Sequence, residues 1–297
     1  MSFNTLGAID IGSNAIRLLI KNIETNKGDV EFKKIAFLRV PIRLGEDTFT
    51  KGFIDKKKEK RLKEALIGFS HIMRAYQVSS YMACATSAMR DAENGMEIVE
   101  HIKEKSGIDI QIITGKQEAE MIFNAGKLNT LIEPGKNYLY IDVGGGSTEI
   151  VLYSKQKKID SRSFQIGTVR MLADKVTKEE KKNFKEWLRD IYEDYAPLHI
   201  IGSGGNINKI HKMLDKTTKE AIHYPELKVL YDVLKSISYE ERIHNFQLNN
   251  YRADVIVPAM KIFIMASKIC KVNEIFVPKI GLSDGIIHYL YTGKKEG

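Results

Sequence analysis

Cysteine is scarce in this sequence, and no hydrophobic run reaches the length of a membrane span. The chain of 297 residues contains two cysteines, Cys84 and Cys270, far apart and each inside an apolar run. This placing excludes a disulfide framework and predicts buried, reduced thiols. The most apolar late segment, 255–270, is interrupted by Pro258 and two lysines, so it predicts a buried helix. With no signal-peptide pattern at the start, we expect a soluble, cytoplasmic protein that contacts no membrane.

Several common catalytic and binding signatures are also absent. The sequence has no G-x-x-x-x-G-K-[ST] phosphate loop, no G-x-S-x-G nucleophile elbow and no zinc-type histidine spacing. These absences exclude an ordinary P-loop and argue against a serine hydrolase. The segment "IGSGGNINKI" does not match the dinucleotide fingerprint, because Ile207 stands where the third glycine should be.

The charge balance is basic, with 46 Lys+Arg against 38 Asp+Glu, a net charge of +8 and a pI near 9.1. Such a surplus attracts polyanions. Part of it lies in runs such as "KKKEKRLKEAL" and "KEEKKNFKEW", which predict solvated helix faces with charges of both signs. No arginine-rich arm or recognition-helix pattern occurs, so nucleic acid is not favoured as a partner.

What the sequence does contain is an internal repeat of long period. "LGAIDIGSNAIRLLI" and "YLYIDVGGGSTEIVLY" both predict a strand, an aspartate, a glycine-rich turn and a second strand. Asp10 therefore corresponds to Asp142, and Gly12 to Gly144. Further along each half, "YMACATSAMRDAEN" and "LHIIGSGGNINKI" predict a strand, a loop and a helix. This order predicts two duplicated domains.

Strand and helix patterns alternate along the chain, which predicts an α/β fold with helix-covered sheets. Apolar residues recur at helical spacing in 56–76, and Thr114 with Gln117 forms the capping-box pattern of a second helix.

The division between the halves is expected within 127–135, where Pro134-Gly135 marks a loop. We therefore predict an N-terminal domain at 1–126 and a C-terminal domain at 127–297, with the last helix able to pack back on the first domain.

The glycine-rich turn of the second copy is longer than a hairpin requires. Gly144, Gly145 and Gly146 are consecutive and Ser147 follows them, whereas a short hairpin needs one or two turn residues. Three glycines cost backbone entropy, but they supply a concave run of unshielded N–H groups that binds anions. We prefer phosphate binding to a plain turn.

Two carboxylates flank this turn, Asp142 before it and Glu149 after it. They would repel a phosphate unless a cation lay between. Because Mg²⁺ takes one or two carboxylates together with water and phosphate oxygens, we expect Mg²⁺, with Mn²⁺ as the alternative, at Asp142 and Glu149. Asp10 could reach the ion through water, although a single such aspartate more often only caps its turn.

Three further segments contain candidate residues. Gly204 lies at a strand-to-helix turn, where helix amides favour anions. Arg90 lies at the corresponding junction of the first half, where a phosphate clamp competes with an ordinary surface arginine. Glu118 and Glu120 both lie near the start of the helix after Thr114, and the residue pattern alone does not separate them.

Seven segments together resemble the exopolyphosphatase / guanosine pentaphosphate phosphohydrolase (Ppx/GppA) family, in its short two-domain form. In order they are "AIDIGSNAIRLLI", "ATSAMRDAENG", "IITGKQEAEMIF", "IDVGGGSTEIVL", "IGSGGNINKI", "YRADVIVPAM" and "GLSDGII". The likeness covers nearly the whole chain. It implies the actin-like ATPase superfamily, with two ribonuclease-H-like domains and an active site in the cleft between them.

The resemblance also assigns roles to residues. Glu118 matches the catalytic glutamate, and Asp142 and Glu149 match the acids of the metal site. The positions that contact phosphate match Gly12, Ser13, Asn14, Arg90, Gly144, Gly145, Gly146, Ser147 and Gly204. Two positions depart from the family pattern: Ala15 replaces a serine, which removes a hydroxyl contact, and Gln117 replaces a glutamate.

By this resemblance we expect an exopolyphosphatase, which hydrolyses the terminal phosphoryl group of inorganic polyphosphate and releases orthophosphate. Guanosine pentaphosphate is the alternative substrate; the basic charge and the lack of an obvious guanine pocket favour polyphosphate. An ATP-dependent kinase on the same fold and a guanosine tetra- or pentaphosphate sensor are more remote alternatives, and the intact acidic residues argue against the sensor. A homodimer is expected by likeness only.

Overall fold

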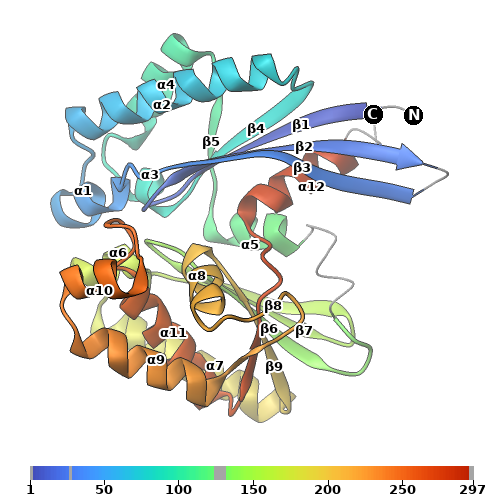
Figure 1. Cartoon of the computed structure of the whole chain (residues 1–297), viewed down its shortest axis with the longest axis vertical. Helices are drawn as coiled ribbons and strands as arrows, with labels where there is room; N and C mark the ends of the chain where they lie inside the picture. Colours follow the sequence, from blue (N-terminus) through green and yellow to red (C-terminus); the bar gives the residue numbers. More distant parts are fainter. Residues whose placement is uncertain (1–2, 27–28, 124–131, 294–297) are drawn as a thin grey trace. The chain divides into compact units, whose positions relative to one another are not determined.

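The computed structural model describes residues 3–26, 29–123 and 132–293. Part of the predicted boundary segment 127–135, namely 127–131, lies outside the described residues. The chain divides into two compact units, which Figure 1 shows in the colours of the sequence.

Unit 1 comprises Met1–Gly126 and Leu282–Gly297, and unit 2 comprises Lys127–Gly281. The final helix, which the sequence analysis placed at the end of the second domain with the option of packing on the first, thus belongs to unit 1.

Unit 1 is built on a five-stranded sheet of order β3-β2-β1-β4-β5. Its strands are β1 (Phe3–Ile11), β2 (Ile16–Asn26), β3 (Asp29–Val40), β4 (Ser80–Ala85) and β5 (Ile110–Ile112). β1, β2 and β3 are antiparallel neighbours, while β1, β4 and β5 run parallel. β1 is apolar on both faces, with Leu6, Ala8, Ile9 and Ile11 all 0% exposed, as expected for a central strand covered on two sides.

Helices cover this sheet. They are α1 (Leu44–Lys51), α2 (Lys56–Ala75), α3 (Ser87–Asp91), α4 (Gly95–Ser106), α5 (Gly115–Phe123) and α12 (Leu282–Gly293). The helix predicted over 56–76 is confirmed as α2, and it buries Leu62, Leu66, Phe69 and Met73. Figure 1 shows α2 and α4 side by side over one face of the sheet, and α12 packs on β1, β2 and β4.

α12 is held in unit 1 by an ion pair and a close helix contact. Lys21 of β2 donates to Asp284 at 2.6 Å, and the lysine is buried. A Cβ on Gly285 would lie 2.1 Å from the carbonyl oxygen of Met121 in α5. Only glycine therefore allows α12 to approach α5 this closely.

Unit 2 contains a six-stranded sheet of order β10-β11-β9-β6-β7-β8. The strands are β6 (Asn137–Val143), β7 (Thr148–Ser154), β8 (Lys157–Phe164), β9 (Leu198–Ser203), β10 (Ile222–His223) and β11 (Glu274–Phe276). β6, β7 and β8 are antiparallel, and β6, β9 and β11 are parallel. Apart from β10, strand order and directions repeat those of unit 1. The predicted internal repeat and the α/β class, with one ribonuclease-H-like sheet in each unit, are confirmed.

The helices of unit 2 are α6 (Thr168–Leu172), α7 (Lys178–Tyr195), α8 (Gly205–Met213), α9 (Tyr224–Ser236), α10 (Tyr239–Phe246) and α11 (Ile256–Ile269). α11 is the predicted buried helix, and it packs against α6, α7, α8 and α9. Cys270 at its end and Cys84 in β4 are both buried free thiols, as predicted.

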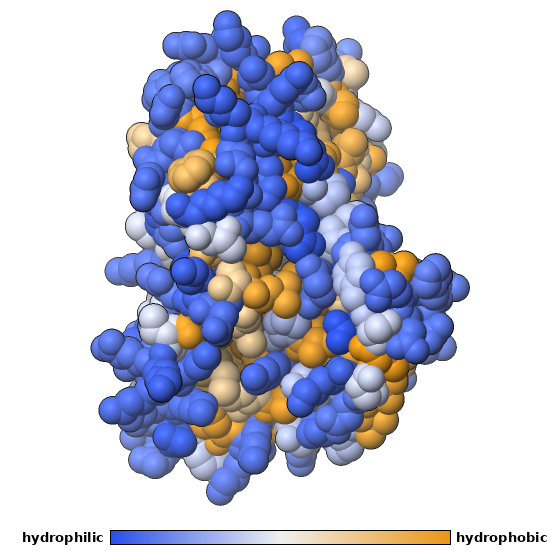
Figure 2. All heavy atoms as spheres, turned by 90° about the vertical axis from the view of Figure 1, so that its left-hand side faces the viewer, coloured by the Kyte–Doolittle hydropathy of each residue, from blue (hydrophilic) through white to orange (hydrophobic). Residues whose placement is uncertain are grey.

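Hydrophilic residues cover most of the face shown in Figure 2, with hydrophobic ones in smaller groups between them. The most exposed large apolar side chains described are Val229 of α9, at 66%, and Met96 of α4, at 65%. Among the described helices, none combines the length and hydropathy needed to cross a bilayer.

Candidate active site

The two glycine-rich turns have the same backbone closure. In unit 1 the Gly12 amide donates to the carbonyl of Ala15 at 3.2 Å, and in unit 2 the Gly144 amide donates to that of Ser147 at 3.0 Å. Each bond runs across the hairpin from one amide to the carbonyl three residues later, the reverse of the β-turn bond, in which the carbonyl of the first residue accepts. The third glycine of unit 2 is therefore not needed to close the hairpin.

The carbonyl groups of the unit 2 turn are bound by the start of α6. The amides of Thr168 and Val169 donate to the carbonyls of Gly144 and Gly145 at 3.0 and 2.7 Å. The Arg170 Nε donates to the carbonyl of Gly146 at 2.7 Å. These bonds fix which way the peptide groups of the turn point.

The amides of Gly145, Gly146 and Ser147 face no acceptor among the residues that the structure describes. With the carbonyls held by α6, three consecutive N–H groups are left to point away from them. Consecutive free amides of this kind can bind an anion, and anion binding by this turn stays a prediction. Phosphate is the expected ligand.

Asp142 and Glu149 are direct cross-strand partners of β6 and β7, so their side chains lie on one face of the sheet with Cβ atoms about 5 Å apart. They are 8% and 1% exposed. The Ser163 hydroxyl donates to Glu149 Oε1 at 2.9 Å. Gly204, at φ +108°, lies against Asp142, because a Cβ there would be 3.0 Å from Asp142 Oδ1. Unit 2 thus brings the predicted metal acids and Gly204 together.

The unit 1 turn is bound in the same manner by α1. The Gly45 amide donates to the Ser13 carbonyl at 2.8 Å and the Arg43 amide to the Asn14 carbonyl at 3.1 Å. A Cβ on Gly45 would lie 2.9 Å from that of Ser13. The Ser13 hydroxyl lies 2.9 Å from the Ser87 hydroxyl at the start of α3.

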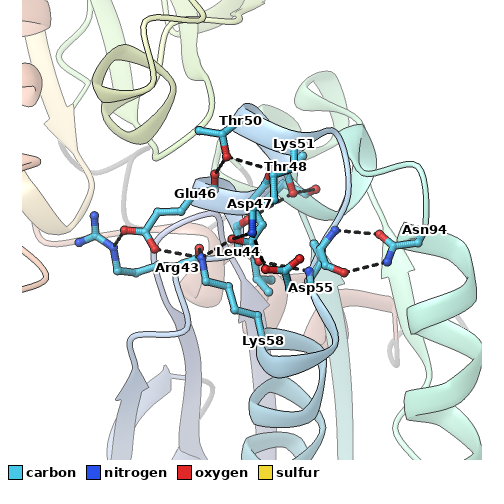
Figure 3. Close-up of polar contacts among 12 residues, drawn as sticks. Arg43, Leu44, Glu46, Asp47, Thr48, Thr50, Lys51, Asp55, Lys58 and Asn94 are labelled. Atoms are coloured by element: carbon cyan, nitrogen blue, oxygen red, sulfur yellow. Dashed lines mark hydrogen bonds and ion pairs between the residues drawn. The ribbon is translucent and has the colours of Figure 1, made fainter.

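Figure 3 shows the polar contacts that fix α1. Asp47 accepts from Lys58 Nζ at 3.0 Å and from the Asp55 amide at 3.1 Å. The Asn94 side chain bonds both backbone groups of Ile54 at 2.9 Å. Burial acts to raise the pKa of Asp47, but Lys58, the Asp55 amide and Lys51 together hold it below its ordinary value. α1, and with it the turn, is tied to α2 by a charged hydrogen-bond network.

The carboxylates of the two copies differ in their partners. Asp10 lies opposite Arg17 across β1 and β2, and the two side chains form an ion pair. The corresponding pair in unit 2 is Asp142 and Glu149. An arginine neutralises the first aspartate, whereas the second faces another carboxylate.

Glu118 lies in the first turn of α5 and is 9% exposed. The predicted cap is confirmed: the Gln117 amide donates to Thr114 Oγ1 at 3.2 Å, and the Thr114 amide donates to Gln117 Oε1 at 2.9 Å. Burial raises the pKa of Cys84 to about 12, with further contributions from the charges of Asp10 and Glu118. Both carboxylates are therefore close enough to β4 to act on one thiol.

Arg90 of α3 also reaches the start of α5. Its Nη1 donates to the Ile113 carbonyl at 2.8 Å, and its Nε lies 3.5 Å from Asp91. The guanidinium is thereby placed one residue before the Thr114 cap. Its role as a phosphate clamp stays a prediction.

Of the predicted site residues, unit 1 contains Gly12, Ser13, Asn14, Arg90 and Glu118. Unit 2 contains the others, namely Asp142, Gly144, Gly145, Gly146, Ser147, Glu149 and Gly204. The sequence analysis missed Arg17, Arg170, Gly45 and Gly167. A glycine follows the third strand of each copy within a few residues, in "IRLGED" and "FQIGTV", but Gly45 lies inside α1 whereas Gly167 comes directly before α6. A Cβ on Gly167 would lie 2.4 Å from the Gly145 carbonyl oxygen.

The chain matches a protein-family model over most of its length. Residues 23–292 match the model of the Ppx/GppA phosphatase family. The bifunctional 3-dehydroquinate synthase/phosphatase of Fusobacterium nucleatum is 29% identical over 240 residues, 74% of this chain and 36% of that protein. Exopolyphosphatase 2 of Mycobacterium tuberculosis is 29% identical over 235 residues, 73% of each. The chain spans about half or less of the first curated relatives that it matches.

Two solved structures share the whole fold. An exopolyphosphatase from Cytophaga hutchinsonii has a TM-score of 0.84 with 25% identity over 98% of both chains. The Ppx/GppA family member of Aquifex aeolicus has a TM-score of 0.77 with 26% identity over 100% of both chains.

Proposed function

This chain belongs to the Ppx/GppA phosphatase family, and on that premise we propose that it is an exopolyphosphatase, a phosphoanhydride hydrolase. The observation that carries the proposal is the glycine turn of unit 2, where the amides of Gly145, Gly146 and Ser147 lie beside two buried carboxylates. The likeness to two exopolyphosphatases supports the same reaction.

In the proposed reaction a water oxygen attacks the terminal phosphorus of polyphosphate. The bond from that phosphorus to the bridging oxygen breaks, orthophosphate leaves, and the bridging oxygen stays on the shortened chain. Glu118 accepts a proton from the attacking water. The glycine amides and the Arg90 guanidinium stabilise charge on the transferring group, because phosphoryl transfer requires mainly positioning and electrostatic support.

Mg²⁺ fits the residues of unit 2. Asp142 and Glu149 are two buried oxygen donors on one face of the sheet, and Mg²⁺ commonly uses one or two carboxylates and completes its shell with water and phosphate. No larger cluster of metal-ligating side chains occurs among the described residues. We propose that these two residues hold Mg²⁺, or Mn²⁺ in its place. When bound, the cation would neutralise the two carboxylates and the phosphate oxygens beside them.

The central experiment measures orthophosphate release from polyphosphate by the Glu118→Gln variant. We expect a fall in kcat of about a thousandfold, since a general base contributes on the order of 10²–10⁴. Glu120→Gln, two positions along the same helix, is the matched control and should retain activity. Near-normal release by Glu118→Gln, with unchanged thermal unfolding, would remove Glu118 from the reaction.

A substrate panel distinguishes the alternatives: long polyphosphate, tripolyphosphate, guanosine pentaphosphate and ATP. Preference for guanosine pentaphosphate would establish the second hydrolase activity of the family. Transfer of labelled phosphate to an acceptor other than water would establish a kinase. Binding of guanosine tetra- or pentaphosphate without turnover would establish a sensor.

We also propose a cytoplasmic homodimer. The two buried, reduced thiols support the location. The dimer follows from likeness alone, and a solution mass measurement tests it.

A further inference from the structure

One face of α7 carries a run of positively charged side chains. Five cationic side chains line a shallow hollow of about 320 Å³ on it: Lys178, Lys181, Lys182, Lys185 and Arg189. At about 100° per residue they fall within an arc of roughly 100°. They extend about 16 Å along the helix, given its rise of 1.5 Å per residue. We call this set the α7 basic stripe.

The charges of the stripe are largely unneutralised. Within the described part of the chain, Lys182 alone has a carboxylate in range, Glu186 at 3.7 Å. All five residues are exposed. Glu186 and Glu193 border the stripe, roughly 90° and 70° round the helix from its centre, and Glu179 and Asp190 lie further round, at roughly 110° and 130°. Charges of both signs thus meet at the edge of the stripe, as the sequence predicts, while its centre is positive.

The like charges at the centre of the stripe cost helix stability. Lys181 and Lys185, and likewise Lys185 and Arg189, are like-charge neighbours four residues apart, a spacing that destabilises a helix by several tenths of a kcal/mol per pair. An ordinary solvated face would alternate the signs at this spacing. The arrangement is what a polyanion-binding surface requires.

The stripe cannot turn away from solvent, because the opposite side of α7 is fixed in the core. Phe184, Trp187 and Leu188 are buried. The indole of Trp187 donates to Asp160 at 3.1 Å, and Phe164 packs edge-on against the rings of Phe184 and Trp187. The Thr177 hydroxyl caps the helix by accepting from the Glu180 amide at 3.0 Å.

We infer that the α7 basic stripe is a second polyphosphate site, which binds a stretch of the chain other than the end being hydrolysed. This rests on the proposed function, and α7 carries none of the candidate active-site residues. Polyphosphate has a charge on every unit and no other recognisable group, so cations alone suffice to bind it. The stripe offers no aromatic side chain for stacking bases and no apolar one for entering a membrane.

The test compares Lys181→Glu/Lys185→Glu with wild type in equilibrium binding of long polyphosphate, with EDTA present so that turnover plays no part. We expect the Kd to rise by about tenfold or more, and the slope of log Kd against log salt to fall in magnitude by about two, one per lost contact. The matched control is Lys56→Glu/Lys60→Glu, which makes the same charge change at the same spacing on α2. It should bind as wild type does.

Steady-state kinetics provides an independent test of the second site. KM should rise for long polyphosphate and stay unchanged for tripolyphosphate, which is too short to occupy both sites. Unaltered binding of long polyphosphate by the α7 variant, or an equal loss in the α2 control, overturns the inference. The inference is also overturned if the α7 substitutions weaken the binding of single-stranded RNA but not that of polyphosphate. A protein that binds polyphosphate through α7 but releases no orthophosphate would overturn the proposed function and leave this site standing.

Discussion

Asp10 and Asp142 occupy the same place in the two copies of the repeat, but their cross-strand partners have opposite charge. Arg17 pairs with Asp10, whereas Asp142 lies opposite Glu149. Two buried carboxylates on one face repel each other unless a cation or a proton intervenes. This difference is the physical reason to expect the metal at Asp142 and Glu149 rather than at Asp10.

Asp47 provides a prediction at the same scale. Because its pKa is lowered in the folded protein, the carboxylate stabilises the fold above its unfolded pKa, near pH 4. That stabilisation is lost as the pH falls through the folded value. Asp47→Asn should cost about 2 kcal/mol at pH 7, the range of a charge-assisted hydrogen bond. Denaturant unfolding at pH 7 and pH 3 should show the difference from wild type shrinking in acid, and an equal difference at both would contradict this account.

The short helices α1 and α6 have the same structural role in their units. Each follows the third strand of its sheet, and each binds the carbonyls of a glycine-rich turn through its first residues. The geometry of the glycine-rich turn therefore depends on a helix that lies outside the motif. Because Gly45 and Gly167 have no Cβ, α1 and α6 can each lie close to the turn that they bind.

Gly167→Ala tests this dependence. Its Cβ would lie 2.4 Å from the Gly145 carbonyl oxygen and from the Gly146 carbonyl carbon, backbone atoms that cannot rotate aside, so the turn must shift. We expect kcat on polyphosphate to fall about a hundredfold, the loss seen when preorganised donors are displaced. Gly68→Ala is the control, since a Cβ there meets nothing within 4 Å. Full activity in Gly167→Ala would show that α6 does not set the turn.

For the whole molecule, the noteworthy feature is that unit 1 is discontinuous in sequence. α12 comes from the end of the described chain and covers β1, β2 and β4, where it buries Ile286 and Ile287. Unit 2 is formed by one continuous segment. The two units should therefore differ in their ability to fold alone.

Truncation tests this difference. We expect residues 132–281 to fold alone and to unfold cooperatively when followed by circular dichroism. Residues 1–126 alone should lack a cooperative transition, because the apolar face under α12 would be exposed. Joining residues 282–297 to 1–126 through a flexible linker should restore the transition. A stable, cooperative 1–126 fragment would show that α12 is dispensable for unit 1.

Features that depend on neighbours along the chain could be predicted from the residues alone. Strand and helix periodicity gave the α/β class and the α2 and α11 helices, and the Thr114–Gln117 cap followed from a spacing of three residues. The repeat was visible because each copy keeps the same local order of strand, aspartate and glycine turn. Such patterns act over a few residues, so they can be read without coordinates.

Which distant residues complete each site could be learned only from the folded chain. Arg17 opposite Asp10, Gly167 against Gly145, and Gly204 against Asp142 are contacts between separate elements. The same holds for the α7 basic stripe: its composition is plain in the sequence, but the direction it faces is set by how Trp187 packs in the core. Sheet register and helix packing determine these contacts, because they bring together side chains that are far apart in the sequence.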